Sequence, residues 1–175
     1  CTDVNVNNVT KDIYPKYNKP KHFVKLGRKK IERLIKRIGI FRVKAKSIFY
    51  LSKTLVDKYK SKVPNTYEEL EQLPGVGHKT ASVVMSQGFG FPAFPVDTHI
   101  HRLAQRWGLT NGKNVVQTEK DLKEVFPKKH WNKLHLQIIW YGREYCKARD
   151  CYGITCKICK SCYPNRKKPI KVKKA

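Results

Sequence analysis

Apolar side chains recur every three or four residues along most of this chain, which is the spacing of one face of an α-helix. The pattern is clear over residues 31–38, and Gly39 follows as a helix stop. A longer amphipathic helix is predicted over residues 43–59. No segment shows a clear strand pattern, so the chain is predicted to be all-α.

Local signals mark several helix boundaries. Pro64-Asn65 ends the helix over 43–59, and Thr66 with Glu69 three residues later has the pattern of a capping box. The Gly75-Val76-Gly77 turn separates this short helix from the next, which is predicted over residues 78–87. Three further helices are predicted to begin at Asp97, Thr118 and Trp131, the last of them running to Tyr145.

An apolar linker with two prolines, residues 89–95, divides these helices into two groups. A chain of 175 residues is long enough to bury one core or two small ones. We therefore expect two helical lobes, residues 1–92 and 93–175, with a boundary near Pro92. The segment after Pro164 is rich in lysine and is predicted to be a low-complexity tail.

The net charge of the chain indicates a polyanionic partner. The chain has 38 Lys and Arg against 13 Asp and Glu, a formal net charge of +25. The basic residues cluster at 25–46 and 165–174. Neutralising phosphates and releasing their counterions is the usual use of such a charge, so nucleic acid is the predicted partner. The alternative is a set of solvated lysine-rich faces.

No apolar run approaches the length of a membrane span, and no signal-peptide pattern is present. We expect an intracellular monomer with no nucleotide cofactor and no membrane association. Its compartment would be the nucleus, a mitochondrion or a plastid in a eukaryote, or the cytoplasm in a bacterium. The chain opens at Cys1 without a methionine and is expected to be an N-terminally truncated fragment.

The turn between the two helices near residue 75 is the strongest local motif. Two helices joined by a Gly-Val-Gly turn predict a helix-hairpin-helix, which grips one phosphate backbone without reading bases. An ordinary helical hairpin is the alternative. Lys79 stands in the first turn of the second helix, so an amine would lie beside the phosphate contact. The predicted DNA-binding residues are Gly75, Val76, Gly77, His78, Lys79 and Thr80.

Asp97 is the only carboxylate between Glu71 and Glu119. It stands where a helix is predicted to begin, so an N-cap role is the plain interpretation. The functional interpretation is a carboxylate that helps proton transfers around Lys79. The two roles are compatible, because a cap holds its carboxylate still. His99 follows closely and is interpreted as a packed or capping histidine or as a residue that lines the site.

Five of the six cysteines crowd into residues 146–162. Thiolates at such spacing are typical of an iron–sulfur cluster or a zinc ion in a reducing compartment. Free thiols and a disulfide-rich tail are the alternatives. Four of the following five residues are the predicted ligands: Cys146, Cys151, Cys156, Cys159 and Cys162.

Three motifs in this order resemble the endonuclease III family of helix-hairpin-helix DNA glycosylases. They are residues 73–81 (LPGVGHKTA), Val96-Asp97-Thr98-His99 and residues 142–146 (GREYC). The resemblance implies a six-helix barrel lobe beside a second helical lobe with a cysteine-rich loop. It also implies that Lys79 is the Schiff-base nucleophile and Asp97 the catalytic aspartate. The lysine favours strand cleavage as well as base removal.

The family's usual cluster pattern is C-x6-C-x2-C-x5-C, and this chain departs from it. Counting from Cys146, Cys156 and Cys162 fit, whereas Gly153 stands at the remaining ligand position. The resemblance therefore implies a [4Fe–4S] cluster held by Cys146, Cys156, Cys162 and either Cys151 or Cys159. The family also has a further N-terminal stretch that this chain lacks.

The predicted function is a bifunctional DNA glycosylase and AP lyase of base excision repair. By resemblance it removes oxidised pyrimidines from double-stranded DNA, acts at abasic sites and nicks the strand by β-elimination. The alternatives are a monofunctional glycosylase, a non-catalytic helix-hairpin-helix DNA-binding module and a zinc-stabilised tail on a nucleic-acid adaptor.

Overall fold

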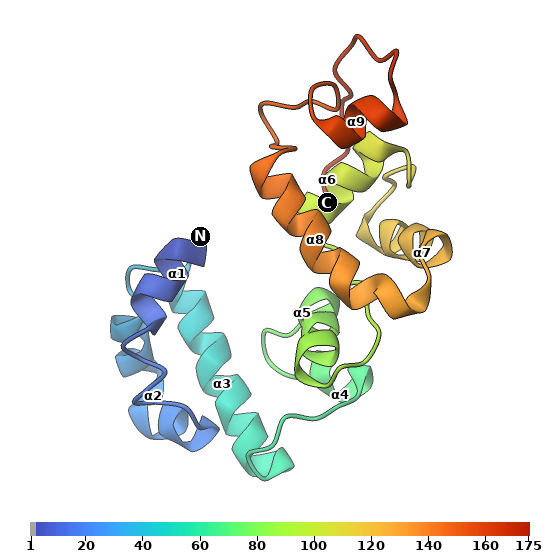
Figure 1. Cartoon of the computed structure of the whole chain (residues 1–175). Helices are drawn as coiled ribbons and strands as arrows, with labels where there is room; N and C mark the ends of the chain where they lie inside the picture. The colour runs from blue at the N-terminus through green and yellow to red at the C-terminus, as the bar shows by residue number, and fades with distance from the viewer. Residues whose placement is uncertain (1–2) are drawn as a thin grey trace. The chain divides into compact units, whose positions relative to one another are not determined.

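The computed structural model describes residues 3–175, and all regular structure within them is helical (Figure 1). The all-α prediction is therefore confirmed. Contacts divide the chain into two compact units, one ending at Gly77 and one beginning at His78. This division falls inside the helix-hairpin-helix motif. The expected lobes, 1–92 and 93–175, describe a different partition and stay a prediction.

The first unit is built from α1 (Asp3–Thr10), α2 (Pro20–Leu34), α3 (Phe41–Tyr59) and α4 (Tyr67–Glu71). The helices α2 and α3 pack against each other along their apolar faces. Their shared core contains Ile13, Ile31, Ile35, Ile38 and Ala45. The periodicity predicted α3 well, although it begins two residues earlier than expected. The helix α2 starts further upstream and is kinked at Gly27, where φ is +70°.

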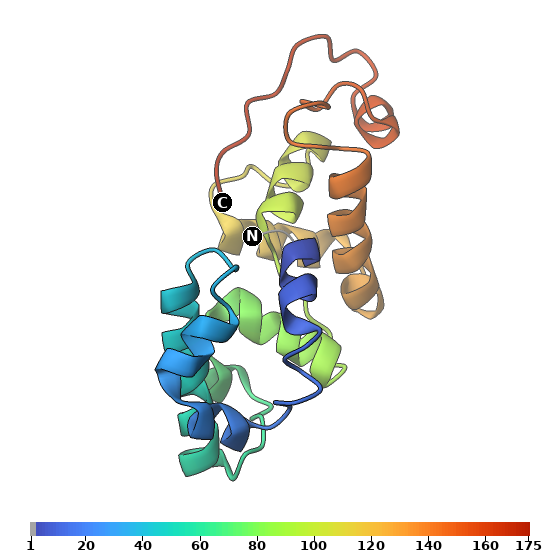
Figure 2. The same cartoon turned by 90° about the vertical axis from the view of Figure 1, so that its left-hand side faces the viewer.

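The second unit contains α5 (His78–Val83), a π-helical turn (Val84–Gly88), α6 (Thr98–Trp107), α7 (Val115–Val125), a 3₁₀ turn (Lys128–His130), α8 (Trp131–Glu144) and α9 (Lys157–Cys162). The central element is α6, which packs against α7, α8 and α9. Figures 1 and 2 show α6 alongside α8. The core joins aliphatic residues of α6 to the cysteines beyond α8.

Helix caps agree with the local sequence signals at two of three positions. Thr66 accepts the Glu69 amide and also bonds the Glu69 carboxylate, which completes the capping box. Asp97 caps α6 as expected. The prediction that Thr118 opens a helix was wrong, because Asn114 caps α7 by accepting the Gln117 amide at 2.8 Å. Thr118 is instead buried within α7 and bonds the Asn114 carbonyl at 3.0 Å.

The lysine-rich segment after Pro164 was predicted from its composition to be a low-complexity tail. It folds back onto its own unit, where Lys173 bonds Gln105 through both its amide and its carbonyl. Both backbone groups and side chains dock this segment, since the Arg166 guanidinium and the Lys173 amine also donate to carbonyls of the same unit. Within residues 3–175, every helix is too short or too polar to cross a bilayer.

Candidate functional site

The glycine turn of the hairpin lies directly against α3. Gly75 has φ +81°, in the left-handed region that favours glycine. A Cβ on Gly75 would lie 2.7 Å from the Cβ of Ser47, so any side chain there would collide with α3. The Val76 amide donates to the Leu73 carbonyl at 3.0 Å and closes the turn. Gly77 has open space where a Cβ would stand. Close packing therefore explains the first glycine of the motif.

The helix α5 begins at His78, with Lys79 in its first turn. The Lys79 side chain is exposed and makes no ion pair with any residue that the structure describes. His78 differs, because its Nε2 lies 3.1 Å from a carboxylate oxygen of Glu119. Glu119 is itself largely buried and also bonds Lys123. Of the two neighbouring basic residues, Lys79 is the one whose amine faces solvent without a salt bridge.

Asp97 is half-buried at the first turn of α6. Its Oδ1 accepts the Ile100 amide at 2.9 Å, and its backbone carbonyl accepts the His101 amide at 2.9 Å. The other carboxylate oxygen, Oδ2, has no hydrogen-bond partner among residues 3–175. The cap therefore uses one oxygen and leaves the second without a hydrogen-bond partner in this part of the chain.

His135 on α8 connects these two residues, and the sequence interpretation missed it. Its ring is only 3% exposed, and neither ring nitrogen has a hydrogen-bond partner in the described part of the chain. Burial lowers the pKa of His135, while the Asp97 charge raises it and the Lys79 charge lowers it further. Both charges thus lie close enough to act on one buried imidazole. A buried polar ring without partners is rare in structural roles and calls for an explanation.

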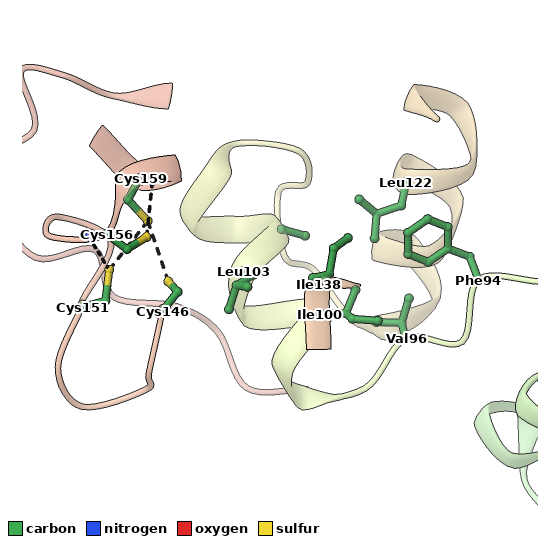
Figure 3. Packing of buried hydrophobic residues seen from close by; sticks show 11 residues of the cluster. Phe94, Val96, Ile100, Leu103, Leu122, Ile138, Cys146, Cys151, Cys156 and Cys159 are labelled. Atoms are coloured by element: carbon green, nitrogen blue, oxygen red, sulfur yellow. Dashed lines mark hydrogen bonds between the residues drawn. The ribbon is translucent and has the colours of Figure 1, made fainter. Parts of the chain in front are cut away.

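The second chemical centre is a group of four buried cysteines, Cys146, Cys151, Cys156 and Cys159. Their sulfur atoms all lie within 4.8 Å of one another and point toward a common centre (Figure 3). Two backbone amides are directed at sulfur: Cys156 N–H lies 3.4 Å from Cys151 Sγ and Cys159 N–H lies 3.5 Å from Cys156 Sγ. Four converging thiols with such donors fit a [4Fe–4S]-binding loop.

Cys162, which the sequence interpretation placed among the ligands, is exposed and lies outside this group. The Cys159 sulfur lies 3.8 Å from the sulfurs of both Cys146 and Cys151, so Cys151 and Cys159 both belong to the converging group. The observed spacing is therefore C-x4-C-x4-C-x2-C, shorter at its C-terminal end than the pattern implied by resemblance. Sequence counting favoured Cys162 because it assumed the family spacing.

Two arginines of α6 hold the cysteine loop, and neither was identified from the sequence. Arg106 is 2% exposed and donates to the carbonyls of Lys147 and Ala148 and to the Cys146 sulfur at 3.3 Å. Arg102 donates to the carbonyls of Gly142 and Cys146, both at 3.0 Å. Their positive charges lie beside the sulfurs and favour the thiolate form of the cysteines, which is the form that binds a metal.

The protonation of the thiols differs across the group. Burial raises the pKa of Cys146 to about 11 despite the Arg106 contact. Burial also acts to raise the pKa of Cys151, but hydrogen bonds from Cys156 and Thr155 bring it down to about 5. Metal binding requires all ligand thiols to lose their protons, so a bound cation would offset the burial at Cys146.

Comparison with known proteins defines the class of this fold. Residues 1–128 match the family model described as HhH-GPD superfamily base excision DNA repair protein. Endonuclease III of Bacillus subtilis is 40% identical over 172 residues, which cover 98% of this chain and 78% of the relative. Endonuclease III of Escherichia coli is 40% identical over 149 residues, covering 85% of this chain and 71% of the relative.

Comparison with solved structures points to the same family. A trapped endonuclease III–DNA covalent intermediate superposes with a TM-score of 0.86 at 41% identity, covering 90% of this chain and 75% of the other. A non-covalent endonuclease III–DNA complex gives a TM-score of 0.85 at 41% identity, covering 90% and 74%. The chain belongs to the HhH-GPD superfamily of base excision DNA repair proteins and, within it, to the endonuclease III family.

Proposed function

We propose that this protein is a bifunctional DNA glycosylase and AP lyase of base excision repair, with Lys79 as its nucleophile and Asp97 as its catalytic carboxylate. Oxidised pyrimidines in double-stranded DNA are the proposed substrates, together with abasic sites. The residue assignment is supported by two observations: the Asp97 carboxylate is held by the Ile100 amide at 2.9 Å, and Lys79, in the first turn of α5, is exposed and has no ion pair among the described residues. The solved relative described as a covalent DNA intermediate supports a nucleophile that bonds to the substrate.

Base removal begins when the damaged nucleotide is flipped out of the duplex, at about a few kcal/mol of lost stacking. The neutral Lys79 amine attacks C1′ of the deoxyribose, and the C1′–N bond to the base breaks. The departing base takes the electron pair and is protonated. The new C1′–N amine loses one proton, the C1′–O4′ bond breaks as O4′ takes up a proton, and a protonated C1′=N Schiff base remains on Lys79.

Strand cleavage follows from the same adduct. The Schiff base withdraws electrons and makes a C2′ proton acidic. Removal of that proton forms a C1′–C2′ enamine that expels the 3′ phosphate as the C3′–O bond breaks. Water then hydrolyses the imine and releases Lys79. An amine nucleophile is required because a hydroxyl or thiol cannot form this electron-withdrawing iminium.

Asp97 is suited to the proton transfers of this sequence. Its Oδ1 is held by the Ile100 amide, so the side chain cannot rotate freely, whereas its Oδ2 has no partner within residues 3–175. A fixed carboxylate near the sugar stabilises the positive charge that develops as the base leaves. It also accepts or relays the protons that Lys79 releases.

The helix-hairpin-helix supplies the grip on DNA in this proposal. The Gly75 turn lies flush against α3, so the backbone near Val76 and Gly77 is held in one conformation. Open space at Gly77 lets a phosphate approach the main chain closely. Such contacts fix the register of the duplex without reading its sequence.

We assign the cluster ligands to Cys146, Cys151, Cys156 and Cys159, because only these four sulfurs converge among the described cysteines. When bound, the [4Fe–4S] group supplies a rigid cross-link between the end of α8 and α9. The cluster loop contains few apolar residues of its own, so ligation rather than packing would fold it. It takes no part in the bond-breaking steps above.

The experiment that tests the assignment is borohydride trapping on duplex DNA with one abasic site. Borohydride reduces a Schiff base to a stable amine, so the wild-type protein should become covalently linked to DNA. Lys79→Gln should give no adduct while it retains DNA affinity. Trapping that persists in Lys79→Gln would contradict the assignment. A folded wild-type protein that removes bases without trapping or nicking would be a monofunctional glycosylase instead.

A further inference from the structure

The chain after α9 is not a loose tail. It returns from the cysteine loop alongside α6 and ends near the loop that precedes α7 (Figure 2). We call residues 166–174 the C-terminal strap. Three of its residues, Arg166, Ile170 and Val172, are half-buried, while its lysines are exposed. The strap thus alternates between groups that hold it in place and charged groups that face solvent.

Three attachments hold the strap. The Arg166 guanidinium donates to the Arg106 carbonyl at 2.8 Å and to the Gly153 carbonyl at 3.0 Å. It also stacks over the Tyr163 ring at 3.7 Å. The Ile170 amide donates to the Tyr152 carbonyl at 3.0 Å. These contacts attach the strap to the outside of the cysteine loop.

The third attachment is a reciprocal pair with Gln105 of α6. The Lys173 amide donates to Gln105 Oε1 at 2.7 Å, and Gln105 Nε2 donates to the Lys173 carbonyl at 3.0 Å. Gln105 is 8% exposed, so its amide group is matched to the strap backbone rather than to water. The Gln105 amide group pairs with both the N–H and the C=O of Lys173. This pairing determines where the strap lies and in which direction it runs.

Close packing at Gly153 supports a built docking position. Gly153 has φ +84°, and a Cβ there would lie 2.5 Å from Ile170 Cγ2. Any other residue at this position would push Ile170 off the loop. The strap therefore lies in direct van der Waals contact with the loop backbone.

The pinned backbone presents Lys167, Lys168 and Lys171 to solvent. None of the three forms an ion pair with a residue in the described range. Asp150 is the only acidic side chain after Glu144, so this part of the molecule offers them no carboxylate partner nearby in sequence. Lysines held close together without acidic partners repel one another. A polyanion that binds along them replaces this repulsion with attraction.

We propose that the strap is a DNA-binding element, in which Lys167, Lys168 and Lys171 contact the phosphate backbone of the duplex and Gln105 is the positioning residue that holds them in register. This inference rests on the proposed function for its partner. Pinning matters because a flexible basic tail loses conformational entropy when it binds, and a strap that is already ordered does not. The strap adds affinity without reading sequence.

The test measures the affinity for duplex DNA across a range of salt concentrations in the full-length protein. Neutralising Lys167, Lys168 and Lys171 to glutamine should weaken binding and lower the slope of log K against log salt by about 2–3, roughly one per phosphate contact. The matched control neutralises Lys58, Lys60 and Lys62, three exposed lysines at the end of α3 with the same total charge. It should change the slope less. Equal losses in both variants would mean that net charge alone matters and would overturn the proposal.

A second variant, Gln105→Leu, keeps every lysine and removes the attachment. Hydrogen exchange should show faster exchange of the Lys173 amide with α6 still protected, and DNA affinity should fall at least about threefold. Wild-type affinity with a released strap would overturn the positioning role. Borohydride trapping at saturating protein separates the strap proposal from the proposed function. If Lys79 still forms the trapped adduct and the strap variants bind DNA normally, only the strap proposal fails.

Discussion

Asp97 accepts the Ile100 amide through Oδ1 at 2.9 Å, so this carboxylate caps α6 with one oxygen and leaves the other without a hydrogen-bond partner among residues 3–175. The cap explains why the side chain is fixed, and the unused oxygen explains how it remains available. Under the proposed function, the structural role and the catalytic role of Asp97 would belong to two different oxygens of the same carboxylate. The relationship can be separated experimentally, because capping needs an acceptor and catalysis needs a charge.

Asp97→Asn should separate these roles. Asparagine caps helices about as well as aspartate, so we expect the free energy of unfolding to change by less than about 1 kcal/mol. Loss of the negative charge should slow base removal and strand cleavage by roughly 10²-fold or more. Single-turnover assays and thermal melting of the same preparation measure the two effects. Normal cleavage rates in the folded variant would show that Asp97 only caps α6.

Replacing His135 by leucine should stabilise or leave unchanged the folded protein while impairing strand cleavage. Neither ring nitrogen has a partner among residues 3–175, so burial of this ring is unfavourable and an apolar side chain removes the penalty. If the buried ring influences the charges of Asp97 and Lys79, its loss should slow cleavage by about tenfold or more. Denaturation and cleavage assays measure both quantities.

The control for this variant is His101→Leu. His101 is also buried, but its Nδ1 lies 2.8 Å from Thr118 Oγ1, and its loss should destabilise the protein by about 1 kcal/mol. A His135→Leu protein that is clearly destabilised but cleaves normally would identify His135 as an ordinary core residue.

Stability should fall as the solution becomes acidic, beginning near the ordinary histidine pKa of 6.5. Burial lowers the pKa values of His135 and His101, so the unfolded chain binds protons at a higher pH than the folded one. The stabilisation is therefore complete above pH 6.5 and is lost as the pH falls toward the lowered values. Urea denaturation between pH 4 and 8 should show a weaker dependence in His135→Leu; an unchanged profile would assign the effect to other groups.

Cys159→Ser and Cys162→Ser are a matched pair that tests the cluster ligands. Cys159 is buried among the converging sulfurs, whereas Cys162 is exposed three residues further along α9. Anaerobically purified wild-type protein should contain about four irons per chain. Cys159→Ser should lose iron and Cys162→Ser should keep it. Iron loss only in Cys162→Ser would support the ligand set implied by the family spacing instead. One zinc ion per chain and no iron would identify the site as a zinc site.

The sequence by itself predicted most of the helices from α3 to α8, the caps at Thr66 and Asp97 and the hairpin turn at Gly75, but not α1, α9 or the first half of α2. These depend on interactions between residues a few positions apart, such as apolar periodicity, a side chain that accepts a nearby amide, and a glycine with positive φ. Lys79 and Asp97 were also selected as site residues from short, ordered patterns, and their roles stay a prediction. Thr118 shows the limit of this reasoning, because Asn114 nearby offered an equally good cap.

Only the tertiary structure decided which groups meet across long separations. Gln105 and Lys173 pair although they are 68 residues apart, and Arg106 reaches the Cys146 carbonyl from 40 residues away. Nothing local indicates that an apolar-flanked histidine at position 135 is buried near two charges, or that Cys151 and not Cys162 joins the converging sulfurs. Such contacts depend on how α6 packs against α8 and α9, and that packing is set by the burial of their combined apolar surfaces rather than by any one segment.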